Sequence, residues 1–314
     1  MTVEYIDLKE SLTVAQAIER IRRKGLDSET INICYVLDHE RKLLGTAALR
    51  YLLLSRPDQT IGDIMHENVI AIHTLMDQEE VAAQFKKYDF TAMPVVDNEN
   101  RMVGIITVDD IVDIIDEETT EDIEKMAAIM PSDKPYMYTG IFETYKKRIP
   151  WLLLLMVSAT FTGQVIKSFE DALSVCTVLT LFIPMLMDTG GNAGSQSSTM
   201  IIRGMAVGEI EAGDILRVLW KELRVGVIVG VLLGLVNYIQ LVIRFPGQEM
   251  LCLTVVLSLL ATVMLAKTIG CVLPIAAQVL HLDPAIMAAP LITTIVDAVS
   301  LIIYFQLACS LLKI

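Results

Sequence analysis

Hydrophobic residues are distributed very unevenly along this chain. The first half carries short strand and helix patterns separated by turn residues, whereas long apolar runs begin near Trp151. A helix that spans a bilayer needs about 20 predominantly apolar residues. Five segments meet this length, at about 149–168, 173–202, 216–243, 250–280 and 285–312. The pattern therefore predicts a polytopic α-helical membrane domain over residues 148–314.

The polar half contains an internal repeat. VLDHERKLLG over Val36–Gly45 returns as VVDNENRMVG over Val95–Gly104, with Asp, Glu and Gly recurring at a constant offset of 59 residues. Each copy has the pattern of a strand, a helix, a strand, a turn, a strand and a second helix. We therefore expect two α/β units, at residues 1–60 and 61–118.

Charge is segregated in the same way as hydropathy. Residues 1–140 carry 27 acidic and 14 basic side chains, whereas residues 141–314 carry 11 of each. An acidic front half argues against nucleic acid as a partner and suits a domain that meets cations. The five cysteines show no CxxC spacing, so we expect neither a disulfide framework nor a zinc site. We also expect no cleavable signal peptide and a front half in the cytoplasm.

Acidic residues are concentrated just before the membrane domain, mostly between Asp109 and Glu124. On a helix, Asp109 and Asp113 share a face at i, i+4 spacing, where like charges are destabilising and a bound cation would remove the repulsion. A solvated face is the alternative interpretation. We expect residues 119–147 to form an acidic connecting helix at the bilayer surface.

Asp297 is the only charged side chain between Pro284 and Leu312. An acid at bilayer depth is costly and by default marks an ion or proton route. Thr293 lies one helical turn before it, beside Thr294, so one face offers the oxygen ligands that hard cations require. A structural Asp paired with another helix is the alternative.

The second apolar segment is unusually rich in small and polar residues. It contains Asp188, Gly190, Gly191, Asn192 and Gly194. Such glycines allow close helix approach or an unwound turn, whose exposed carbonyls could line a path beside the asparagine and aspartate oxygens. In the fourth segment, we expect Lys267 to pair with an acid of another span, and a role in transport is the alternative.

The chain resembles two known families at these motifs. The repeat resembles a CBS-domain pair, in which Gly104–Asp110 (GIITVDD) matches a nucleotide-binding turn with Thr107 and Asp110 in the matching places. ATP is therefore a possible ligand, and a Thr helix cap followed by an Asp in the first turn is the alternative interpretation.

Two further runs, PMLMDTGGNAGSQSSTMIIRGMAVG and DPAIMAAPLITTIVDAVSLIIYF, are similar to the signature helices of MgtE-type magnesium transporters. The resemblance implies a homodimer in membrane lipid, with a pore on its two-fold axis and Asp297 as the pore carboxylate. It also implies regulatory Mg²⁺ ligands among the front-half and connecting-segment acids. The resemblance suggests Glu99, Asp109, Asp133 and Glu143 for this role. We add Asp113, because it shares a helix face with Asp109.

The chain departs from the family pattern in two places. Members usually begin with a helical N domain, whereas this chain starts inside or at the edge of the first CBS unit, so we expect either a natural lack of most or all of that domain or a truncated form. Ala289 also stands where relatives often have Asn before Pro290.

We therefore expect a Mg²⁺ uptake channel of the bacterial cytoplasmic membrane, gated by cytosolic Mg²⁺, and not an enzyme. If the N-terminus is in the cytoplasm, seven Lys and Arg residues near the span ends lie on the cytoplasmic side and three lie outside. This excess favours a cytoplasmic N-terminus and an external C-terminus. A cation- or proton-coupled secondary transporter, with Asp297 as its protonation site, is the alternative. An intramembrane aspartyl hydrolase using Asp188 and Asp297 is a further one.

Overall fold

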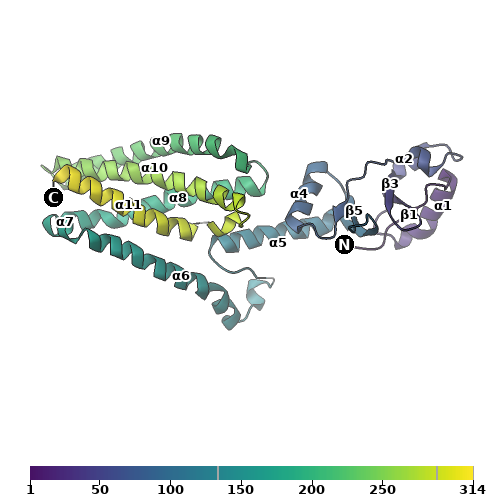
Figure 1. The fold of residues 1–314 in the computed structure, drawn as a ribbon, viewed down its shortest axis with the longest axis horizontal. Helices are drawn as coiled ribbons and strands as arrows, with labels where there is room; N and C mark the ends of the chain where they lie inside the picture. Colours follow the sequence, from purple (N-terminus) through teal and green to yellow (C-terminus); the bar gives the residue numbers. More distant parts are fainter. Residues whose placement is uncertain (133, 288, 314) are drawn as a thin grey trace. The chain divides into compact units, whose positions relative to one another are not determined.

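The computed structural model describes residues 1–132, 134–287 and 289–313. The described chain divides into two compact units, Met1–Thr119 and Thr120–Ile314, here named the front unit and the membrane unit. Each unit is described by itself. The ribbon in Figure 1 shows their elements in sequence colours.

The front unit is built from two copies of one α/β arrangement. The first comprises β1 (Asp7–Leu8), α1 (Val14–Lys24), η1 (Gly25–Asp27), β2 (Ile33–Leu37), β3 (Leu43–Ala48), α2 (Leu49–Leu54) and α3 (Ile61–Ile64). The second comprises β4 (Ile72–His73), α4 (Gln78–Tyr88), β5 (Ala92–Val96), β6 (Met102–Thr107) and the first part of α5 (Val108–Met126), whose residues from Thr120 onward belong to the membrane unit. Each copy forms a three-stranded sheet whose first pair of strands is parallel and whose second pair is antiparallel.

The repeated residues occupy equivalent positions in the two sheets. Val36 pairs with Gly45 in the first sheet, and Val95 pairs with Gly104 in the second. The repeated aspartates close the hairpins, since Asp38 Oδ1 accepts from Lys42 N and Asp97 Oδ1 accepts from Arg101 N, both at 2.8 Å. The repeat in the sequence is thus a repeat of turn chemistry and strand register.

Helix α5 differs from the expected connecting helix over 119–147. It begins at Val108 and ends at Met126, and only the short η2 (Tyr136–Tyr138) interrupts the loop that follows within the described residues. Ala128 has a positive φ of 55°, and Ile129 N donates to Glu124 O at 2.9 Å. This left-handed termination closes the helix, and the prolines at 131 and 135 cannot continue it.

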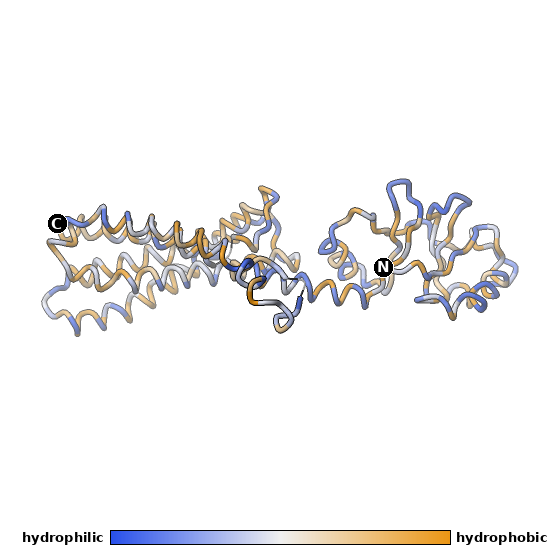
Figure 2. The backbone as a smooth tube through the Cα atoms, turned by 90° about the horizontal axis from the view of Figure 1, so that it is seen from below, coloured by the Kyte–Doolittle hydropathy of each residue, from blue (hydrophilic) through white to orange (hydrophobic). Residues whose placement is uncertain are grey.

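The membrane unit is a bundle of long helices. Its elements are α6 (Ile141–Ser168), α7 (Glu170–Val175), η3 (Thr177–Phe182), α8 (Ile183–Ala206), η4 (Ala212–Asp214), α9 (Ile215–Arg244), α10 (Glu249–Val279), η5 (Pro284–Met287) and α11 (Ala289–Leu312). Hydrophobic residues, in orange, recur along these helices in Figure 2. The main core lies between α8, α10 and α11 and includes Leu186, Leu259, Val296 and Tyr304.

Four helical segments of the described chain are long and apolar enough to cross a membrane: Ile141–Ser168, Ala212–Arg244, Glu249–Val279 and Pro290–Leu312. The second of the five expected segments, 173–202, differs from the expectation. Its first residues form α7 and η3, and α8 starts at Ile183 with Pro184 in its first turn, where a missing N–H is tolerated. The small and polar residues of α8 lower its hydropathy, yet the helix packs against both α10 and α11.

Glycines bring α8 and α10 into backbone contact. A Cβ on Gly270 of α10 would lie 2.3 Å from the carbonyl oxygen of Gly194 on α8. Within a membrane, association of helices depends on such close packing, because lipid is as apolar as the side chains it would replace.

This contact predicts that a methyl group added at Gly270 lowers the stability of the protein. Gly270→Ala should destabilise the protein by about 1–3 kcal/mol, because the backbone of α8 has to move away. Thermal unfolding of the purified protein in detergent measures the change. Gly163→Ala is the matched control, since nothing lies within 4 Å of its Cβ position. Equal melting temperatures for the two variants would contradict the packing described above.

Candidate ion site

A cavity of about 220 Å³ lies between α8 and α11. It is lined by Met187, Asp188, Gly191, Asn192, Thr293 and Asp297. Two carboxylates, one amide and one hydroxyl thus face a single space, which is open to the surface of the membrane unit at Asp188 and Asn192. Oxygen atoms of these types are the ligands that Mg²⁺ prefers.

Helix geometry explains why these residues meet. Asp188, Gly191 and Asn192 share one face of α8 at i, i+3 and i+4, and Thr293 and Asp297 share one face of α11 at i, i+4. Gly191 permits the close approach, because a Cβ there would lie 3.0 Å from Thr293 Cγ2.

Hydrogen bonds hold the polar groups around the cavity. Asn192 Nδ2 donates to Asp188 Oδ1 at 3.2 Å, which leaves the amide oxygen of Asn192 available. The hydroxyls of Thr293 and Thr294 both donate to the carbonyl oxygen of Pro290, at 2.9 and 3.0 Å. Thr293 therefore presents its hydroxyl lone pairs, and not its proton, to a cation in the cavity.

Most of the residues expected from the sequence line this cavity, but three do not. Gly190 and Gly194 instead pack against α10 and α11, with Thr262 Cγ2 2.7 Å from the Cβ position of Gly190 and Ile292 Cγ2 2.8 Å from that of Gly194. Thr294 is outside the lining. Met187 lines the cavity and was not expected, because an apolar side chain gives no signal for an ion site.

The two carboxylates that line the cavity differ from Lys267 and Glu222 in whether they form ion pairs. Among the described residues, neither Asp188 nor Asp297 forms an ion pair. Lys267, expected to pair with an acid, lies 3.3 Å from Glu222 Oε2 on α9. Two carboxylates facing one space repel each other, and a divalent cation between them would offset that repulsion. Within the described part of the chain, no group of three or more His, Cys, Asp or Glu side chains is arranged to hold a metal.

Three of the expected regulatory acids, Glu99, Asp109 and Glu143, have partners within the chain itself. Glu99 forms an ion pair with Arg101 at 2.7 Å, as its repeat Glu40 does with Lys42 at 2.9 Å. Hydrogen bonds from the Thr107 hydroxyl and from backbone N–H groups lower the pKa of Asp109. Asp113 lies on the exposed surface of α5, and Asp133 lies outside the described residues.

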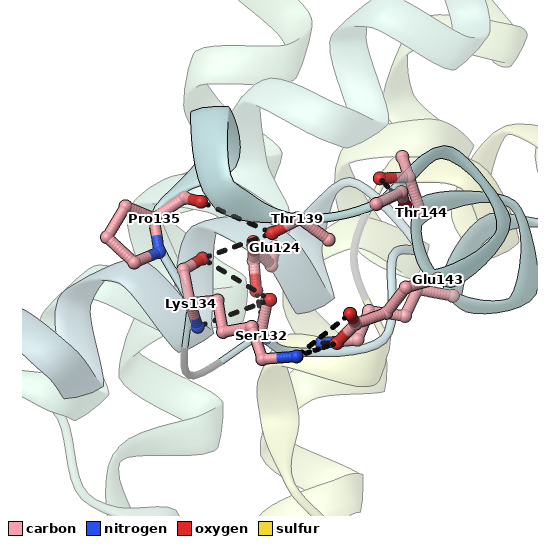
Figure 3. A network of polar contacts seen from close by, with 9 residues as sticks. Glu124, Ser132, Lys134, Pro135, Thr139, Glu143 and Thr144 are labelled. Carbon is pink, nitrogen blue, oxygen red and sulfur yellow. Dashed lines mark hydrogen bonds and ion pairs between the residues drawn. The ribbon is translucent and has the colours of Figure 1, made fainter.

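A polar network ties the segment between α5 and α6 together (Figure 3). Ser132 N donates to Glu124 Oε2 at 2.8 Å, and Lys134 Nζ lies 3.0 Å from Glu143 Oε2. Glu143, the remaining expected regulatory ligand, therefore has a lysine as its partner in this structure.

The end of α5 contacts the segment that leads into α11. Lys125 Nζ lies 2.5 Å from Asp283 Oδ2 and also contacts the Glu121 carboxylate. Burial lowers the pKa of Lys125, but hydrogen bonds with Asp283 and Glu121 outweigh burial and leave the pKa raised. The ammonium is therefore charged at neutral pH. Met126 packs beside it against Ile202 and Ala285.

The expected nucleotide residues lie at the junction of β6 and α5. Thr107 ends the strand and is 8% exposed. Asp110 lies in the first turn of the helix, with Oδ2 3.1 Å from the amino group of Met1.

The repeated α/β unit, the apolar helices and the acidic cavity define a multi-pass membrane transporter for divalent cations with a CBS module. Family models agree: residues 183–307 match MgtE, a divalent cation transporter, and residues 61–117 match the CBS domain. The magnesium transporter MgtE of Thermus thermophilus is 37% identical over 313 residues, which cover 100% of this chain and 69% of that protein. The Bacillus subtilis magnesium transporter MgtE is 37% identical over 309 residues, 98% of this chain and 68% of that protein. The chain belongs to the MgtE family of magnesium transporters.

A solved structure of the cytosolic domain of the Mg²⁺ channel MgtE in complex with ATP is also similar. It is 44% identical over 36% of this chain and 46% of that chain, with a TM-score of 0.36.

Proposed function

We propose that this protein is a Mg²⁺ uptake channel of the bacterial cytoplasmic membrane, with Asp297 as the carboxylate that selects the ion. The supporting observation is the cavity between α8 and α11, in which Asp297 faces Asp188, Asn192 and Thr293. A carboxylate without an ion-pair partner among the described residues, facing a cavity at membrane depth, has the setting expected of an ion route.

The small number of carboxylates that line the cavity suits an ion that keeps most of its water ligands. Mg²⁺ demands octahedral oxygen coordination and loses its waters reluctantly, so it is usually bound through one or two carboxylates. In the proposed homodimer the pore lies on the two-fold axis, and two copies of Asp297 surround one hydrated ion. Selection then rests on charge and on the size of the hydrated ion.

The proposed topology places the N-terminus in the cytoplasm and the C-terminus outside. It counts α8 as a fifth span beside the four more apolar helices. The support for α8 is its packing against α10 and α11, which makes a bilayer position compatible with its small and polar residues. The orientation follows the excess of Lys and Arg at the ends assigned to the cytoplasm.

Gating by cytosolic Mg²⁺ is part of the proposal. Mg²⁺ bound to acids of the CBS module and the connecting segment holds the pore closed, and loss of Mg²⁺ releases it. The contact between Lys125 and Asp283 offers a mechanical connection, since Asp283 directly precedes η5 and α11. A displacement of the end of α5 would thereby move the helix that carries Asp297.

ATP binding to the CBS module is the remaining part of the proposal. Its support is the Gly104–Asp110 motif, which places Thr107 and Asp110 at a strand-to-helix turn. The N-terminus of α5 would add backbone N–H groups and a favourable dipole for a phosphate.

The central test is the removal of one negative charge. Asp297→Asn should reduce Mg²⁺ uptake into proteoliposomes at least about tenfold, because a neutral amide attracts a dication far less in a low-dielectric site. Asp171→Asn, an exposed acid of α7 outside the cavity, is the control and should transport normally. Undiminished uptake by Asp297→Asn would refute the role of this carboxylate, and flux that follows a pH gradient would favour a proton-coupled transporter.

The gating connection is tested by charge reversal. Lys125→Glu and Asp283→Lys, each alone, should leave Mg²⁺ uptake less inhibited by internal Mg²⁺, and the double variant should restore the inhibition. Uptake with internal Mg²⁺ varied measures this. Arg217→Glu is the control, because Arg217 pairs with Asp214 within its own segment at 2.9 Å. A double variant no closer to the parent than either single variant would exclude the connection.

Nucleotide binding is tested by calorimetric titration of the full chain with ATP. We expect saturable heat that is lost in Thr107→Ala, since the alanine lacks the hydroxyl of the half-site. Thr46→Ala, in the equivalent strand β3 of the first copy, should leave the heat unchanged. Absence of heat with the parent protein would remove ATP from the proposal.

A further inference from the structure

Three helices of the membrane unit are joined by one buried polar network. Lys267 of α10 is 5% exposed, and its Nζ lies 3.3 Å from Glu222 Oε2 of α9. The Ser197 hydroxyl of α8 donates to the same Glu222 oxygen at 2.6 Å and accepts from Lys267 Nζ at 3.1 Å. Each of the three side chains therefore contacts the other two.

The network has a strongly preferred geometry. The side chains of Lys267 and Glu222 are 6% and 14% exposed, so neither charge is well solvated. A buried ion pair is costly to separate, because each unpaired charge then lacks both water and its partner. Ser197 completes the pair, since its hydroxyl serves the carboxylate and the ammonium at once.

Ser197 lies on the side of α8 opposite to the cavity. It follows Asp188 by nine residues, which is about two and a half turns of an α-helix. Rotation of α8 about its axis would therefore move Ser197 and the cavity residues together, in opposite directions. A group that holds Ser197 in place also holds Asp188 and Asn192 toward Thr293 and Asp297.

The rest of the α8 interface consists mainly of packing contacts, which include the buried side chains of Leu186 and Ile201. Gly194 lies one turn before Ser197 on α8, and its carbonyl oxygen packs against Gly270 of α10. Gly270 in turn lies one turn after Lys267 on α10. Glycines allow close approach but present a smooth surface without directional bonds. The hydrogen bonds of Ser197 are directional and connect α8 to two other helices.

We propose that Ser197 is a positioning residue for ion selection: through the Lys267–Glu222 pair it sets the rotation of α8 and thereby aims Asp188 and Asn192 into the cavity. It does not touch the ion. This inference rests on the proposed function, in which the cavity is the ion path.

The test separates positioning from stability. Ser197→Ala leaves the ion pair balanced but removes its bonds to α8, so the apparent KM for Mg²⁺ uptake should rise about threefold to tenfold, the range typical of residues that act through packed neighbours. The ratio of Mg²⁺ to Mn²⁺ uptake should fall with it. A purely structural defect would lower the amount of active protein, and hence the maximal rate, without changing KM or the ion ratio.

Two variants serve as controls in the same proteoliposome assay of the full chain. Ser258→Ala removes an equally buried hydroxyl, which donates to Thr254 O within α10 at 2.7 Å, and should keep the parent KM. Ser197→Thr retains a hydroxyl and should restore KM and ion ratio. If Ser197→Ala does not reach the membrane, Ser197→Cys carries the same expectation, since a thiol is of similar size and a weak donor.

The outcomes distinguish this inference from the proposed function. A raised KM and altered ion ratio in Ser197→Ala, with Ser258→Ala unchanged and Asp297→Asn inactive, supports positioning by Ser197. Parent KM and ion ratio in Ser197→Ala, with Asp297→Asn inactive, overturns the inference and leaves the pore intact. Normal uptake by Asp297→Asn overturns the pore and the positioning role together.

Discussion

Charge inside an apolar helix bundle is the constraint on which the membrane unit depends. A charged group at that depth has to find a partner of opposite sign or face an aqueous space. Lys267 and Glu222 take the first course and, with Ser197, join α8, α9 and α10. Asp188 and Asp297 take the second and face a cavity. The same physical cost thus produces a structural contact in one place and a candidate ion site in the other.

In α8, the glycines that allow close packing also make it possible to bury polar side chains. Its glycines let α10 and α11 approach, and the approach buries Ser197 and Ser198 as well as the apolar core. A helix with so few large apolar residues would be a poor span if it faced lipid. Packed on one side against α10 and α11, it presents the amide of Asn192 and the carboxylate of Asp188 on its exposed face, where the cavity lies.

The acidic front unit follows a different rule, because water is available to it. Its duplicated hairpins pair Glu40 with Lys42 and Glu99 with Arg101, and such exposed pairs contribute little to stability. The proposed gating requires such acids to exchange a lysine or arginine partner for a divalent cation, and weak pairing would keep the cost of that exchange small. The partly buried contact of Lys125 with Asp283, both in the membrane unit, is of another kind, since it connects the end of α5 to the segment before α11.

The sequence by itself determined the class of fold, the duplication at an offset of 59 residues and the special position of Asp297, because hydropathy, repeats and isolated charges are properties of the chain alone. Tertiary structure decided the rest. The end of α5 at Met126 follows from a left-handed Ala128, and the choice of Glu222 as partner of Lys267 follows from the packing of α9 on α10. Which of the glycines face the cavity depends on the rotation of α8, and only contacts between helices set that rotation.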